Sequence, residues 1–174
     1  MRAVLVFVLF TASTLALSQD KAAIAASQAA CGPINVKFDA EPDETHHPVP
    51  EPDPAKALVF VIQDLDQEQC FNCALTKVAL DGAWLGANQG SSYLFFNAEP
   101  GERHLCVNWQ SRLKMRSRIF GLANFNAEAG HVYYFRVRLL GARGIFSFDL
   151  DPINSDQGKF LVASSPVSVS HVKQ

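Results

Sequence analysis

The sequence predicts an all-β protein, an antiparallel β-sandwich of about seven strands with a short helix near the C-terminus. Apolar, β-branched runs of strand length recur along the chain, and turn signals such as Asp-Gly and Pro-Gly separate them. The length of 174 residues favours a single domain. The composition, with 48% hydrophobic and 18% charged residues, excludes a wholly disordered or collagen-like chain.

The expected strands follow one another through most of the chain. Residues 57–63 form a continuous apolar run, which is typical of a strand covered on both faces. Residues 131–140 alternate, so Tyr133, Phe135, Val137 and Leu139 should share one face. Asp81-Gly82 is a strong signal for a hairpin turn between two strands. Further segments with a strand-like pattern are residues 34–38, 76–80, 83–85, 93–97, 103–110, 116–125 and 144–150.

Two segments outside the strands have their own character. Residues 39–54 hold six acidic residues, five prolines and no Lys or Arg, which predicts an extended linker or a surface loop. Residues 155–163 predict a short helix, with Ser155 as N-cap and Asp156 near the positive end of the helix dipole. The tail, residues 164–174, is expected to be irregular.

The first segment has the features of a secretory signal peptide. Arg2 supplies a positive charge, residues 3–17 are uncharged and mostly apolar, and Ser18 ends a small-residue cleavage site. A membrane anchor is the alternative, but the run is shorter than the roughly 20 residues that span a bilayer. We therefore expect a signal peptide over 1–18, an N-terminal arm and acidic linker over 19–55, and the sandwich with its helix and tail over 56–174. Lipid attachment at Cys31 is disfavoured, because Gln28 stands where a lipobox has an aliphatic residue.

A resemblance to a known family covers roughly residues 56–160. The matching strings are ALVFV at 57–61, VALDGAWLGAN at 78–88, YLFFNAEPGERHL at 93–105 and AEAGHVYYFRV at 127–137. They resemble an uncharacterised family of exported bacterial domains, domain of unknown function 2846. PEGA-like and carboxypeptidase-regulatory-like sandwich modules share the D-G hairpin and the P-G-x-H turn. The resemblance implies an immunoglobulin-like or transthyretin-like sandwich that acts as a binding or spacer module on the bacterial envelope. It supplies no catalytic residues.

Four cysteines in an exported chain predict two disulfides, for which three pairings are possible. We favour Cys70–Cys73 as a local bridge and Cys31–Cys106 as a long-range bridge that ties the N-terminal arm to the sandwich. The alternative for Cys106 is a buried, reduced thiol that packs as a small apolar side chain.

The C-x-x-C pair also raises a redox alternative. A reactive thiolate needs a lowered pKa, whereas Asp64, Asp66 and Glu68 precede the pair and would raise it. No helix is expected after Cys73, so a structural staple is favoured over a thiol–disulfide oxidoreductase. A zinc site is disfavoured because a second C-x-x-C or H-x-H partner is missing.

No residues stand out as catalytic, and no cofactor is implied. Neither G-x-S-x-G nor H-E-x-x-H occurs in the sequence. His46 and His47, beside Asp43 and Glu44, are weak candidates for a divalent metal ion. A solvated loop is the favoured interpretation, since a flexible segment preorganises a metal site poorly.

A basic stripe is the most distinctive candidate for partner binding. Arg112, Lys114, Arg116 and Arg118 alternate, so a strand would project all four from one face. The stripe could contact an anionic envelope polymer or the acidic 39–54 segment, or it could be an edge whose charges deter aggregation.

Trp84 and Trp109 are further candidate contacts. We expect both to pack inward, because large aromatic side chains are highly buried on average.

The function predicted from the sequence is a non-enzymatic binding or accessory module of the cell envelope, periplasmic or secreted. A redox enzyme using Cys70 and Cys73 and a spacer without a ligand are the alternatives. The partner is expected to be an anionic envelope polymer or another envelope protein. Nucleic acid is excluded as a partner, because the chain is exported and has a formal net charge of -2.

Overall fold

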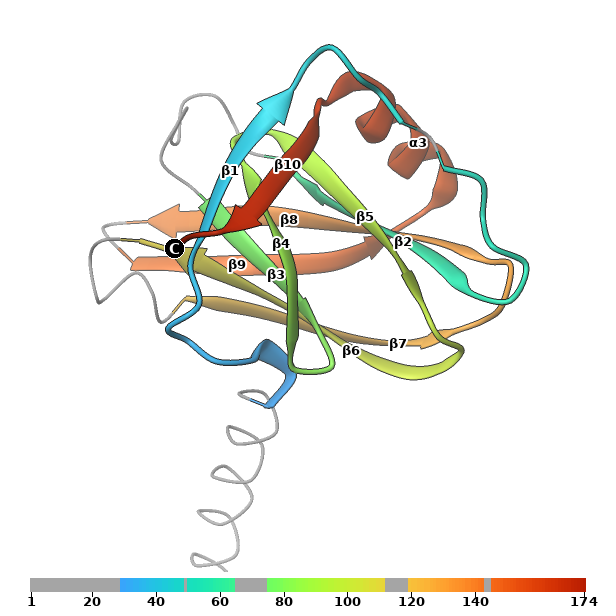
Figure 1. Cartoon of the computed structure of the whole chain (residues 1–174), viewed down its shortest axis with the longest axis horizontal. Helices are drawn as coiled ribbons and strands as arrows, with labels where there is room; N and C mark the ends of the chain where they lie inside the picture. The colour runs from blue at the N-terminus through green and yellow to red at the C-terminus, as the bar shows by residue number, and fades with distance from the viewer. Residues whose placement is uncertain (1–28, 49, 65–74, 112–118, 143–144) are drawn as a thin grey trace, which may run out of the picture.

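Two β-sheets packed face to face make up most of the molecule (Figure 1). The computed structural model describes residues 29–48, 50–64, 75–111, 119–142 and 145–174, which contain ten strands and helix α3. This arrangement confirms the predicted β-rich sandwich with a short C-terminal helix. The predicted strand number of about seven is wrong, since the described residues contain ten strands.

The six-stranded sheet has the order β1-β10-β5-β2-β8-β9. It is mixed rather than purely antiparallel as predicted, because β2 pairs in parallel with β8 and β10 pairs in parallel with β5. Neighbouring parallel strands require a long connection, and the chain between β2 and β8 uses it to build the second sheet. The strands are β1 (Phe38–Asp43), β2 (Ala57–Gln63), β5 (Ser92–Ala98), β8 (Val132–Ala142), β9 (Ile145–Ile153) and β10 (Val167–Val172).

The four-stranded sheet is antiparallel throughout, with the order β4-β3-β6-β7. Its strands are β3 (Leu75–Leu80), β4 (Ala83–Gln89), β6 (Gly101–Gln110) and β7 (Phe120–Ala127). Asp81 and Gly82 connect β3 to β4 with φ of 50° and 82°. Positive φ at both central residues is the signature of a type I′ turn, so the predicted hairpin is confirmed.

The main hydrophobic core lies between the sheets. Alternate residues of β2, β3, β6, β8 and β9 point into it, as period-two strands require. Tyr133, Phe135, Val137 and Leu139 contribute the same face of β8 to this core, as the alternation predicted. Every residue of β2 is buried, which confirms the prediction of a strand covered on both faces.

Helix α3 (Ser155–Ser164) covers part of the outer face of the six-stranded sheet. It lies over a second apolar cluster in which the rings of Phe60 and Tyr134 stack with centroids 5.1 Å apart. Asn154 is the N-cap, and its side chain accepts a hydrogen bond from the backbone N–H of Gln157. The prediction of Ser155 as N-cap is therefore wrong by one residue, because Asn154 has the extended backbone that a cap requires.

Strands β1 and β10 differ from the sequence predictions. The strand expected over residues 34–38 begins only at Phe38, and it continues to Asp43 inside the acidic segment. The tail, expected to be irregular, forms β10, which pairs with β1 from Phe38↔Val172 to Asp43↔Val167. Each of these strands gains its backbone partner from the other end of the chain, and local composition carries no signal of such a pairing.

Within the described ranges, no helix combines the length and apolar character needed to cross a membrane.

Candidate functional site

A strap, defined here as residues 29–37, crosses the outer face of the four-stranded sheet before the chain enters β1 (Figure 1). Its covalent attachment is the disulfide between Cys31 and Cys106 of β6, with Cα atoms 5.1 Å apart. Both cysteines are buried in a small cluster with Ala79. The predicted long-range pairing is thus confirmed, and the alternative of a reduced Cys106 is wrong.

Hydrogen bonds hold the strap along its length. The backbone N–H of Gly82 donates to the carbonyl of Ala30 over 3.0 Å. The indole Nε1 of Trp84 donates to the carbonyl of Pro33 over 2.7 Å. These donors belong to the β3–β4 hairpin, so the hairpin and the disulfide fix the strap from two neighbouring strands.

Two glycines allow the strap to lie so close to the hairpin. A Cβ on Gly32 would lie 2.5 Å from the carbonyl oxygen of Gly82, and a Cβ on Gly82 would lie 2.5 Å from that of Ala29. Both glycines also have positive φ, which side chains disfavour. Any larger residue at either position would push the strap away from the sheet.

Lys77 anchors the second half of the strap from below. Its side chain is 2% exposed, and its Nζ donates to the carbonyl of Val36 over 3.0 Å. The same Nζ lies 4.0 Å from the ring centroid of Trp84, within cation–π range. Burial lowers the pKa of Lys77 to about 8. The strap therefore rests on a cation that its own carbonyls help to solvate.

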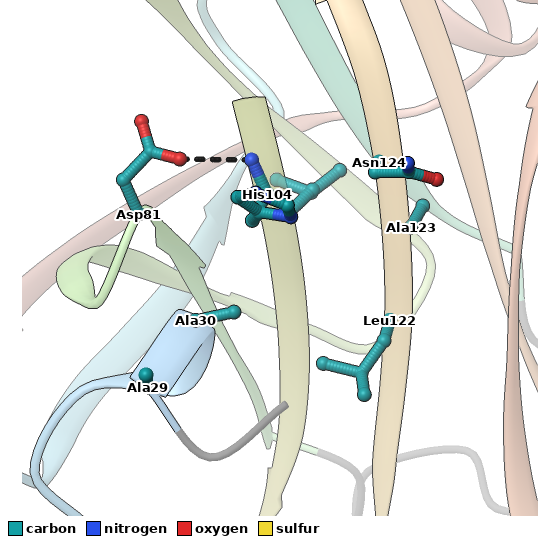
Figure 2. Close-up of a pocket in the computed structure, with 8 residues that line it drawn as sticks. Ala29, Ala30, Asp81, His104, Leu122, Ala123 and Asn124 are labelled. Atoms are coloured by element: carbon teal, nitrogen blue, oxygen red, sulfur yellow. Dashed lines mark hydrogen bonds between the residues drawn. The ribbon is translucent and has the colours of Figure 1, made fainter. Parts of the chain in front are cut away.

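A groove of about 530 Å³ opens beside the first residues of the strap. Figure 2 shows Ala29 and Ala30 of the strap on one side, His104 of β6 in the middle and Leu122 of β7 on the other side. The surface of the groove is mainly apolar. Its lining residues are Ala29, Ala30, Asp81, His104, Leu105, Leu122, Ala123 and Asn124.

Asp81 has its carboxylate committed to the protein. One oxygen accepts a hydrogen bond from the backbone N–H of His104 over 2.8 Å, which Figure 2 shows as a dashed line. The other oxygen accepts a hydrogen bond from Nη1 of Arg103 over 3.0 Å. These bonds hold the hairpin turn against β6. The carboxylate is consequently a structural group of the groove rather than a free acid or base.

The remaining polar groups of the groove are His104 and Asn124, which are register partners on β6 and β7. Both side chains are exposed. Among the described lining residues, His104 and Asp81 are the ones that can ionise. A catalytic pair needs a nucleophile or acid held by a positioned base. The described lining lacks that arrangement and instead offers apolar walls with a polar rim, which suits binding.

Several predicted site residues lie outside the described residues. These are Cys70 and Cys73 of the C-x-x-C pair, together with the basic stripe, Arg112, Lys114, Arg116 and Arg118. The local disulfide, the redox alternative and the partner-binding stripe all stay predictions.

The histidine pair does not form a metal centre with other residues of the described chain. Nδ1 of His46 lies 2.8 Å from Oδ2 of Asp43, and Thr45 donates to the other oxygen of that carboxylate. Hydrogen bonds from Thr45, followed by the contact with His46, hold the pKa of Asp43 well below its usual range. In the described part of the chain, no three His, Cys, Asp or Glu residues gather as metal ligands would.

The two tryptophans have different roles. Trp109 is 2% exposed and makes an edge-to-face contact with Phe146 in the core, as predicted. Trp84 is only half-buried and holds the strap, so the prediction that it packs into the core is wrong. Trp84 lies on the outer side of β4, where it packs against the Cys31–Cys106 cluster and bonds to Pro33 of the strap.

Sequence reasoning missed the groove itself. The Asp81-Gly82 signal located one end of it, but only as a turn. Leu122 lies in the segment predicted as a strand over residues 116–125, with no local sign that it borders a groove. The groove needs the strap to pack over residues far away in the sequence. The signal that could have found it is the predicted Cys31–Cys106 bridge, which places the strap beside β6.

Comparison with known proteins gives no match: no protein-family model fits the chain, and the search of curated proteins returns no significant relative.

Proposed function

We propose that this chain is an exported β-sandwich module of the bacterial cell envelope that binds a partner and catalyses no reaction. The groove beside the strap is the observation that carries the proposal. It is a mainly apolar surface hollow with a polar rim, and the carboxylate that borders it is already hydrogen-bonded. Such a surface recognises shape and apolar area rather than transferring protons or electrons.

The proposed occupant is an apolar side chain of another envelope protein. Leu122 is 44% exposed on the outer face of β7 and would supply the main contact. His104 and Asn124 at the rim would hydrogen-bond to the backbone of the inserted segment. Disulfide attachment of the strap supports this role, since a prearranged wall lowers the ordering cost of binding.

The export part of the proposal rests on the signal-like residues 1–18 and on the disulfide, because disulfides persist in oxidising compartments. A cysteine in a disulfide cannot also carry a thioether-linked lipid, which supports a module without an anchor at Cys31. An immunoglobulin-like or transthyretin-like grouping, and kinship with domain of unknown function 2846, belong to the same proposal.

A binding assay with an apolar dye tests the groove. N-phenyl-1-naphthylamine should fluoresce more strongly with the exported form of the protein, and Leu122→Asp should abolish most of that gain. A photo-crosslinking amino acid at position 122 should also capture a discrete partner in intact cells.

Leu140→Asp is the matched control, because Leu140 is 46% exposed on β8 of the other sheet. The control should keep both the dye signal and the folded circular dichroism spectrum. Equal losses in the two variants, or crosslinks of the same pattern from positions 122 and 140, would contradict a binding site at the groove.

A further inference from the structure

A group of polar side chains is buried between the two sheets, in an interior that is otherwise apolar. Its members are fully buried, and each belongs to a strand end: Gln63 ends β2, Thr76 lies near the start of β3, Asn88 lies near the end of β4 and Ser92 begins β5. Here we call Thr76, Asn88 and Ser92 the polar triad.

The strand register brings the triad to one end of the interior. Thr76 and Asn88 are direct partners in the four-stranded sheet, while Gln63 and Ser92 are direct partners in the six-stranded sheet. Nδ2 of Asn88 donates to the carbonyl of Val61 over 3.0 Å, which is a bond from one sheet to the other. Only residues 90 and 91 separate β4 from β5, so Asn88 and Ser92 flank a tight connection between the sheets.

Three side-chain oxygens of the triad have no hydrogen-bond partner among the described residues. They are Oγ1 of Thr76, Oδ1 of Asn88 and Oγ of Ser92, each with almost no solvent-accessible surface. A buried hydroxyl or amide oxygen without a hydrogen-bond partner destabilises the folded state, because it loses its hydration and gains nothing in return. Three such oxygens gathered at one end of a sandwich call for an explanation, because buried polar groups are nearly always hydrogen-bonded.

We propose that the polar triad binds internal water, which bridges the two sheets at this end of the sandwich. Ser and Thr hydroxyls both donate and accept, and the Asn oxygen accepts, so together they offer a water molecule the two to four partners that it needs. Water suits the site better than a cation. A buried ion requires compensating charge, and all members of the triad are neutral.

Thr76→Val gives the sharpest test, because valine keeps the shape of threonine and removes the hydroxyl. If water is bound, the substitution removes one of its partners, so the urea midpoint falls. The long-lived water signal in oxygen-17 relaxation dispersion of the exported protein should fall with it. If no water is bound, valine removes an orphaned group and the midpoint rises. A raised midpoint with an unchanged relaxation signal overturns the proposal.

Val78→Thr is the matched control, since Val78 is also fully buried, on the same face of β3, and packs in the dry core. Its added hydroxyl should lower the midpoint without adding a long-lived water signal. Ser92→Ala provides a second, independent loss of a water partner and should lower the relaxation signal as Thr76→Val does. Replacing sodium and potassium by N-methylglucamine at equal ionic strength should leave the midpoint unchanged. A midpoint that depends on either cation would overturn the assignment to water.

Discussion

The outer faces of the two sheets are covered in different ways, and the difference shows which cover can leave an opening. On the six-stranded sheet, α3 buries Val162 over the stacked rings of Phe60 and Tyr134. On the four-stranded sheet, the strap is held by a disulfide and by hydrogen bonds from Trp84 and Lys77. Apolar packing of α3 closes the part of the six-stranded sheet that the helix covers. The strap covers only part of the four-stranded sheet, and the groove lies beside its first residues, over β6 and β7.

Of the changes considered, removal of the disulfide should lower the stability most and should loosen the strap but not α3. Replacing Cys31 and Cys106 by Ala releases a link across 75 residues. The free energy of unfolding should fall by about 3–5 kcal/mol in the chain-entropy description. Urea denaturation measures the loss, and hydrogen exchange should show reduced protection of the strap while α3 keeps its own. Equal loss of protection on both faces would mean that the two covers are not independent.

Gly158→Ala tests how closely α3 packs on the six-stranded sheet. A Cβ at this position would lie 2.2 Å from Cγ of Tyr134, so the helix must move off the sheet. We expect a loss of about 1–3 kcal/mol, the usual range for an overpacked contact. The sign is diagnostic, because Gly→Ala inside a helix otherwise stabilises by roughly 0.5–1 kcal/mol. Lys159→Ala, on the exposed side of α3, is the control and should change the midpoint little.

The buried Lys77, which anchors the strap, predicts that the free energy of unfolding depends on pH. Its pKa is about 8 in the folded protein, against 10.5 as the ordinary value. Between these values the unfolded chain binds more protons, so stability should rise with pH above about 8. Lys77→Met should lack that rise. The difference between the two proteins is the quantity to measure, since burial raises the pKa of Tyr93 and Tyr134 in both. Parallel curves from pH 7 to pH 9.5 would contradict a buried cationic anchor.

Trp84→Phe should have the smallest effect. Phenylalanine keeps an aromatic face for the Lys77 cation but removes the hydrogen bond to Pro33. A loss of about 1 kcal/mol is expected, as for a typical hydrogen bond. Dye binding in the groove should sharpen the result, because a looser strap moves one wall of the groove. Unchanged stability together with unchanged dye binding would show that the indole bond does not hold the strap.

The sequence was most informative where the determinants are local. The buried strand β2, the apolar face of β8 and the type I′ turn at Asp81-Gly82 each follow from residue type and period. The compartment and the number of cysteines predict disulfides, but they leave three pairings open, of which Cys31–Cys106 belongs to the favoured one. The sequence was uninformative where two distant segments decide the outcome, as in the pairing of β1 with β10.

The candidate site was largely hidden in the sequence for the same reason. The groove combines the strap, the β3–β4 turn, β6 and β7, and apart from Asp81 in the turn signal its lining residues have no unusual local pattern. The exposed Leu122 is indistinguishable in sequence from a core residue. Residue type alone favours the core for Trp84. Its actual position is decided by the strap, which lies far from it in the sequence, as the separation of 51 residues between Trp84 and Pro33 shows.

The pairing of the first strand with the last has a consequence for folding kinetics. β1 finds its partner only when β10 is available, and Lys173 then forms an ion pair with Asp39 across a separation of 134 residues. Closing so long a loop is slow compared with forming a hairpin. The interval before closure leaves the edge of β5 uncovered, and an uncovered edge invites pairing with other chains. The time that the six-residue strand β10 needs to reach β1 therefore sets how long a newly made chain is prone to aggregate.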